Sequence, residues 1–181
     1  MMTESERFWQ TAKLGHLASS HAFIAAVPFV DFIFVAGSIA TGNVKPESDI
    51  DLIVGCRAGR IWTVRLMMII FLEIQGVRRR DGDVKQNSSN KICLNHFVTP
   101  ASYRLQPPYN SYWVNLYQKL IPFGGNNDAI RAFFTANADW AGPRASIREV
   151  SSLDNTAREF FELILSGSFS FTRIRRESTY T

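Results

Sequence analysis

Two aspartates that stand two residues apart, Asp49 and Asp51, have a spacing suited to carboxylate chemistry. They lie in the run D-I-D-L-I-V, which predicts a strand over residues 49–54. Because successive side chains of a strand point to opposite faces, both carboxylates should lie on one face of a sheet. Such a pair is stable either in contact with solvent or around cations, and oxygen ligands of this kind suit Mg²⁺. Two such ions can hold the attacking and the leaving oxygen of a phosphoryl-type transfer.

A second candidate for phosphate chemistry, Gly37 followed by Ser38, comes directly after a hydrophobic run that predicts a strand over residues 31–36. Gly37 lets the backbone approach a phosphate closely, since glycine has no Cβ. Ser38 can donate its hydroxyl and its N–H to phosphate oxygens, above all if it opens a helix. Lys45, in the polar stretch 43–48, is either a group that reaches a triphosphate or a solvated loop lysine.

Gly-Ser after a strand, a short spacer, and Asp-hydrophobic-Asp-hydrophobic in a second strand together resemble the signature of the DNA-polymerase-β-like nucleotidyltransferase superfamily. The resemblance covers residues 32–98 at the level of motifs. It implies that an acceptor hydroxyl attacks the α-phosphate of a nucleoside triphosphate, ATP in the first place, and that pyrophosphate leaves. It also implies Mg²⁺ or Mn²⁺ held by Asp49 and Asp51, and β- and γ-phosphates held by Gly37 and Ser38. The acceptor stays open between a small molecule, a protein side chain and an RNA end.

The third acidic residue of that superfamily commonly lies on the strand beside the Asp-x-Asp strand, where it completes the metal site and can accept the proton of the attacking hydroxyl. Residues 91–98, K-I-C-L-N-H-F-V, predict this strand but contain no Asp or Glu. Asn95 stands where the acid is expected, and His96 should point to the opposite face. Asn95 can offer its carbonyl oxygen to a metal, but it carries no charge and cannot serve as a base.

Three explanations of the missing acid are compatible with the sequence. The enzyme works with two carboxylates and a water-mediated proton path, or Asp83 supplies the third carboxylate through a different register. Alternatively, the protein is a catalytically impaired nucleotide-binding or regulatory module that does not turn nucleotide over. A separate hypothesis, binding of nucleic acid, rests on the three consecutive arginines at 78–80 and on the basic C-terminal tail.

The elements that must position these residues alternate between strands and helices, which predicts an α+β fold. We expect a small mixed sheet of the nucleotidyltransferase type, flanked by helices, in a core over residues 1–100. A helical C-terminal region over 101–181 should pack on this core and end in a basic tail. An apolar run predicts a mostly buried helix over 61–75, and Gly and Asn at 124–127 predict a loop. Further helices are expected over 4–14, 17–26, 110–120, 128–138 and 152–165.

The composition, with 46% hydrophobic and 20% charged residues, is that of a chain that can bury a core. The formal net charge of +4 is compatible with an anionic ligand and is also ordinary for a protein of this size. Cys56 and Cys93 are expected to be thiols, and with the three histidines they show no zinc-binding spacing. Proline and aspartate interrupt the apolar stretch 22–40, so we expect no membrane span and a cytoplasmic protein. The oligomeric state does not follow from the sequence.

Overall fold

The computed structural model describes residues 2–20, 24–80 and 89–144 of the chain. Four strands in these residues form one mixed sheet in the order β3-β2-β1-β4. Strand β1 runs antiparallel to both β2 and β4, whereas β2 and β3 run parallel. The strands are β1 (Val30–Val35), β2 (Ile50–Cys56), β3 (Ile92–Val98) and β4 (Ile121–Gly125). This arrangement confirms the predicted α+β fold with a small mixed sheet.

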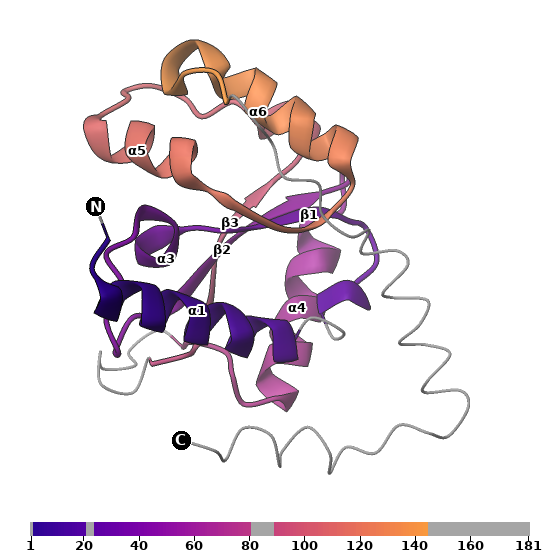
Figure 1. Ribbon diagram of the computed structural model, residues 1–181. Helices are drawn as coiled ribbons and strands as arrows, with labels where there is room; N and C mark the ends of the chain where they lie inside the picture. The colour runs from indigo at the N-terminus through magenta and orange to yellow at the C-terminus, as the bar shows by residue number, and fades with distance from the viewer. Residues whose placement is uncertain (1, 21–23, 81–88, 145–181) are drawn as a thin grey trace.

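Helices cover both faces of the sheet, with α1 and α4 on one side and α5 and α6 on the other (Figure 1). A short helix, α3, connects β1 to the loop that leads into β2. The helices are α1 (Glu4–Ser19), α3 (Gly37–Thr41), α4 (Ile61–Ile74), α5 (Ser111–Lys119) and α6 (Asn127–Ala141), with the 3₁₀-helix η2 (Pro100–Ser102). The helix predicted over 152–165 and the basic tail lie outside the described residues.

Alternation along β1 divides the core into two layers. Ile33 and Val35 pack in the layer of α1 and α4, whereas Phe32 and Phe34 pack in the layer of α5 and α6. The ring of Phe133 in α6 lies 5.5 Å from the ring of Phe32 and 5.0 Å from that of Phe34, between centroids. Because β1 is buried on both faces and paired along both edges, its end holds the residues that follow it in a defined position.

The loop predicted over residues 124–127 is wrong at its start, because strand β4 includes its first two residues. The strand continues through Gly125, which pairs with Phe32 of β1. Gly125 has φ 136°, and a Cβ there would overlap the backbone of Phe32, so this close approach requires glycine. A strand that holds Pro122 and two glycines gives no β-propensity signal, and it forms because β1 offers it an edge. The segment after residue 100 therefore adds a strand to the sheet as well as helices.

Helix α4 forms where the apolar run predicts it, but the expectation that it is mostly buried is wrong. Val64, Met68 and Leu72 are buried against the sheet, while a second apolar face is between 45% and 79% exposed. Because the run contains few polar residues, its sequence does not reveal which face turns outward. None of the helices in the described part of the chain is long and apolar enough to cross a membrane. The exposed residues of α4 are Trp62, Leu66, Ile70 and Ile74.

The buried amide of Asn137 is the polar centre of the layer formed by α5 and α6. Its Nδ2 donates to the carbonyl oxygens of Tyr103 and Phe133, at 2.8 and 2.9 Å. Its Oδ1 accepts from the backbone N–H of Leu105 and from the indole N–H of Trp140, both at 3.0 Å. One side chain thus fastens the segment after η2 to α6.

We expect Asn137→Ala to lower the free energy of unfolding by about 1–3 kcal/mol, because buried donors and acceptors lose their partner. Urea denaturation followed by circular dichroism measures this change. Thr135→Ala, on the exposed side of the same helix, is the matched control and should change stability by no more than about 0.5 kcal/mol. Equal stability of the two variants would contradict the role given to Asn137.

Candidate active site

The predicted phosphate and metal residues meet in one cleft at the end of the sheet where β1 ends and β2 and β3 begin. The register places Val35 beside Leu52, and Asp51 beside Cys93, so three strand ends lie next to each other. The cleft has a volume of about 430 Å³. Its walls are Gly37, Ser38, Thr41, Asn43, Lys45, Glu47, Ser48, Asp49, Asp51, Arg79 and Tyr112.

Gly37 lies directly against the carboxylate of Asp51. Its φ is 61°, and a Cβ at this position would overlap Asp51 Oδ2. The backbone N–H of the preceding residue, Ala36, donates to the carbonyl oxygen of Asp51 at 2.9 Å. Glycine is therefore required here both by the backbone conformation and by the neighbouring carboxylate. The Gly-Ser pattern predicts phosphate contact for this glycine, but it does not reveal that Asp51 packs against it.

A buried lysine of α1, Lys13, holds the loop before Asp49 through hydrogen bonds to its backbone. Its side chain is 0% exposed, and Nζ donates to the carbonyl oxygens of Pro46 and Ser48 at 3.0 and 2.6 Å. A third bond, of 3.2 Å, reaches Oδ1 of Asn90, just before β3. Burial lowers the pKa of Lys13, while the negative charge of Asp49 opposes this shift. One ammonium thus fixes the segments that lead into both β2 and β3.

The two aspartates face a cation that the chain itself supplies. The guanidinium of Arg79 forms an ion pair with Asp49 Oδ2. Arg79 is positioned by its backbone N–H, which donates to the carbonyl oxygen of Ile92 in β3 at 2.9 Å. Burial, and then the charge of Asp49, raise the pKa of Asp51 to about 6, while Arg79 acts against this rise. The site therefore concentrates negative charge that a cation stabilises.

Cys93 is the residue of β3 that lies beside the carboxylates. It pairs with Asp51 in the β2–β3 register, and its thiol hydrogen-bonds the carboxylate of Asp51. The sulfur and one carboxylate oxygen from each of Asp49 and Asp51 all lie within 4.8 Å of one another. This donor set fits a divalent cation, because three ligand atoms of suitable type converge on one side of the sheet.

An irregularity in β3 changes the alternation that was expected along this strand. Asp51 pairs with Cys93 but Ile53 pairs with His96, so β3 has one more residue than β2 between the two pairs. His96 therefore follows Cys93 on the same side, contrary to the simple alternation, and burial lowers its pKa. It does not line the cleft. The side chain of Asn95 and all of Asp83 lie outside the described residues, so their roles stay predictions.

Several residues of the cleft were not singled out by the sequence. Glu47 adds a carboxylate two residues before Asp49, and Tyr112 at the start of α5 places a 55% exposed ring on the wall. Glu47 could have been predicted, because it is an acidic residue in the loop directly before the Asp-x-Asp strand. Tyr112 comes from the opposite half of the chain, and only the packing of α5 on the sheet brings it to the cleft.

The arginine triplet is divided between two acidic partners. Arg78 and Arg80 both bond to the carboxylate of Glu73, each at 2.7 Å, while Arg79 turns to Asp49. The triplet is thus not a set of three unpaired cations. This pairing weakens the hypothesis of a nucleic-acid surface, because a phosphate backbone would have to compete with the carboxylates.

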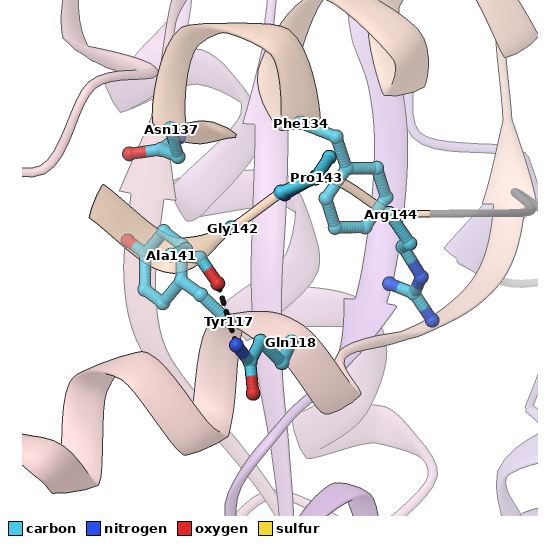
Figure 2. Close-up of a pocket in the computed structure, with 8 residues that line it drawn as sticks. All are labelled: Tyr117, Gln118, Phe134, Asn137, Ala141, Gly142, Pro143 and Arg144. Carbon is cyan, nitrogen blue, oxygen red and sulfur yellow. Dashed lines mark hydrogen bonds between the residues drawn. The ribbon is translucent and has the colours of Figure 1, made fainter. Parts of the chain in front are cut away.

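A second hollow, of about 270 Å³, is lined by residues of α5, of α6 and of the segment that follows α6 (Figure 2). Gln118 Nε2 donates to the carbonyl oxygen of Ala141 across it, at 2.7 Å. Arg144 lies with its guanidinium 4.5 Å from the ring centroid of Phe134. Among the described residues that line this hollow there is no carboxylate. Among the described residues, those predicted to bind phosphate and metal therefore line the cleft at the strand ends and not this hollow.

Comparison with known proteins supports the motif. Residues 22–84 match the family described as the nucleotidyltransferase domain, over about a third of the chain. The matched range contains β1, α3, β2 and α4, and with them the Gly-Ser turn and both aspartates. It thereby confirms the resemblance predicted from the sequence, while Cys93 and β3 lie beyond it. No curated protein and no solved structure matches the chain significantly.

We expect Lys13→Met to lower the free energy of unfolding by about 2–4 kcal/mol and to displace the loop before Asp49, because three acceptors lose one buried donor. Lys91→Met is the matched control, since Lys91 makes an exposed bond to the carbonyl oxygen of Gly76, and it should cost less than about 1 kcal/mol. Chemical denaturation gives both values. If Lys13→Met is no less stable than Lys91→Met, the loop is not held in this way.

We expect Asp51 to titrate near pH 6 in protein free of divalent cations, and its neighbours to move the pKa in opposite directions. Asp49→Asn removes a negative charge and should lower the pKa of Asp51, whereas Arg79→Gln should raise it. The carboxyl ¹³C chemical shift of Asp51, followed as a function of pH, gives this pKa in the wild type and in both variants. Because the folded pKa lies above the ordinary 3.8, the contribution of Asp51 to stability is present below pH 3.8 and is lost as pH rises through 6. A pKa that neither substitution moves would contradict this account.

Proposed function

We propose, from the nucleotidyltransferase domain that residues 22–84 match, that this protein transfers a nucleoside monophosphate from a nucleoside triphosphate to a hydroxyl acceptor. The observation that carries the proposal is the shared cleft, in which the Gly-Ser turn after β1 faces the two aspartates of β2. A polyphosphate requires donors and a cation within a few ångströms of each other, and this cleft offers places for both. ATP is the first donor to test.

The roles that we propose divide between the metal and the phosphate groups. Asp49 and Asp51 hold a divalent cation, and Mg²⁺ and Mn²⁺ are the ions that two carboxylates alone predict. Such an ion, when bound, neutralises charge on the transferring phosphate and on the leaving pyrophosphate. Gly37 and Ser38 donate backbone N–H and hydroxyl hydrogens to the β- and γ-phosphates, and Lys45 reaches the same oxygens from the loop.

Two residues of the cleft extend the proposal beyond the motif. Arg79 lies beside Asp49, so once a cation neutralises that carboxylate, its guanidinium can turn to a phosphate in the same cleft. Tyr112 offers an exposed ring on which a nucleobase can stack. Stacking tolerates every base, and we therefore expect the protein to discriminate weakly between nucleoside triphosphates unless other groups contact the base edges.

The fate of the acceptor's proton separates catalysis from binding alone. In the part of the chain that the structure describes, the carboxylates that line the cleft are Glu47, Asp49 and Asp51. Glu47 is not part of the cluster around the cation position, so we propose that the proton leaves through water. Asn95 remains the predicted neighbour of the metal on β3.

The second candidate function is a nucleotide-binding or regulatory module that does not turn nucleotide over. It is favoured by the uncharged thiol of Cys93 beside Asp51, in a strand that commonly carries an acid in the superfamily. Without a base next to the metal, the attacking hydroxyl keeps its proton longer and transfer slows. The same cleft then reports nucleotide binding to another surface of the protein.

We expect ATP to bind only in the presence of a divalent cation, Mg²⁺ or Mn²⁺ being the first to test, with affinity reduced at least about 100-fold in the double variant Asp49→Asn, Asp51→Asn. Isothermal titration calorimetry measures binding, and release of pyrophosphate from labelled triphosphate measures turnover. Asp128→Asn, which removes a 92% exposed carboxylate on α6, is the control and should bind like the wild type.

The outcomes separate the two functions. Metal-dependent binding with pyrophosphate release supports transfer, and loss of both in the double variant assigns them to this cleft. Metal-dependent binding without release in the presence of nucleoside, peptide and RNA acceptors supports the regulatory module. Binding that needs no metal, or that survives the double substitution, would overturn both.

A further inference from the structure

We propose that Cys93 is the third protein ligand of the cation site, and that the site consequently prefers a thiophilic divalent cation of the Zn²⁺ type over Mg²⁺. This inference rests on the proposed function in one respect, that Asp49 and Asp51 hold a cation. It changes the expected identity of that cation, and it assigns to β3 a ligand that the sequence motif does not contain.

The placement of the sulfur carries the first step. The parallel pairing of β2 and β3 puts Cys93 beside Asp51, and the extra residue of β3 follows only after this pair. The sulfur is therefore fixed by regular strand pairing rather than by a loop. Its distance from the oxygens of Asp49 and Asp51, within 4.8 Å, is short enough for one ion to contact all three. Cys93 is partly exposed, whereas Cys56, the other thiol, is buried at the opposite end of β2.

The charge at this position carries the second step. Asp49 already holds a guanidinium, that of Arg79, against one of its oxygens. The site is thus one at which the fold places positive charge. A metal ion that binds there replaces the Arg79 contact and adds bonds that a planar guanidinium cannot make, since sulfur is a weak hydrogen-bond acceptor but a strong ligand of soft cations.

The chemistry of the donor set carries the third step. Mg²⁺ takes oxygen ligands and retains several waters, so a sulfur in its shell is unfavourable. Zn²⁺ accepts carboxylate oxygen and thiolate sulfur alike, and zinc sites that act on substrates keep three protein ligands and one open position. Two oxygens and one sulfur match that number. On binding, the S–H bond of Cys93 is broken, the thiolate electron pair forms the bond to the metal, and the proton passes to solvent.

The test uses the full chain, freed of metal by a chelator and kept reduced. Cd²⁺, which gives an ultraviolet charge-transfer band when it bonds a thiolate, is the optical probe, and Zn²⁺ and Mg²⁺ are titrated in competition with it. We expect one equivalent of Cd²⁺ to produce the band, and Zn²⁺ to displace it at concentrations far below those of Mg²⁺. Cys93→Ser should lose the band and weaken Zn²⁺ binding at least about tenfold, with Mg²⁺ affinity nearly unchanged.

Three further variants keep the outcome specific. Cys56→Ala should retain the band, because that thiol is buried away from the site. Asp51→Asn should weaken Cd²⁺ binding at least about tenfold, since the same ion contacts both residues. Cys93→Asp should lose the band and bind Mg²⁺ at least about tenfold more tightly than the wild type, whereas Asn95→Asp should retain the band.

The inference is overturned by a wild-type protein without the band, by a band that persists in Cys93→Ser, or by Cd²⁺ binding that Asp51→Asn leaves unchanged, since a lone thiol would then be the ligand. A gain of Mg²⁺ affinity in Asn95→Asp but not in Cys93→Asp would likewise give the third position to Asn95. These readouts need no nucleotide. If Cys93→Ser binds ATP with Mg²⁺ and has the same metal preference as the wild type, the proposed function stands and the inference fails. If the wild type shows the band and Cys93→Ser loses it, but neither protein binds ATP, the inference stands and the proposed function fails.

Discussion

Repulsion between two carboxylates at the start of a buried strand is the constraint that shapes this protein. Unit charges within 4.8 Å of each other repel by about 3–4 kcal/mol at an effective dielectric constant of about 20. The fold does not relieve this by turning the aspartates to solvent. Asp51 packs against a glycine, and Arg79 forms an ion pair with Asp49. The loop before Asp49 is held by the ammonium of Lys13. The two negative charges thus stay close together, and the positive charge of Arg79 partly compensates them.

The scaffold around the site separates rigidity from chemistry. The aromatic layer under α5 and α6 and the aliphatic layer under α1 and α4 hold β1 from both faces. The cleft lies where β1 stops and its neighbours start, so its groups are fixed by strand ends rather than by long loops. Tyr112 and three residues of the loop before β2, Asn43, Lys45 and Glu47, reach the cleft from more exposed positions. The carboxylates that we propose as metal ligands thus lie at the start of a strand that pairs along both edges.

The sequence predicted the part of the site that depends on local pattern. Gly37, Ser38 and the two aspartates are set by strand, turn and strand within a short stretch, and period-two alternation places the carboxylates together. Cys93 was beyond that reasoning, because its place beside Asp51 depends on the register between β2 and β3. Arg79 was missed for a similar reason, since its ion pair depends on the edge of β3. The exposed face of α4 could not be predicted, because its apolar run contains few polar residues to mark the side that faces outward.

The same limits explain the fourth strand. β4 contains proline and glycine, residues that argue against a strand, yet it closes the sheet beside β1. This composition has a further consequence for how the molecule behaves at high concentration. Pro122 has no N–H to offer a neighbouring chain, and the short strand ends at a glycine whose backbone turns away from extended geometry. At the other border, the start of β3 is covered by a bridge between Arg78 and Ile92. Among the described residues, both edges of the sheet thus carry features that disfavour pairing with the edge of another molecule.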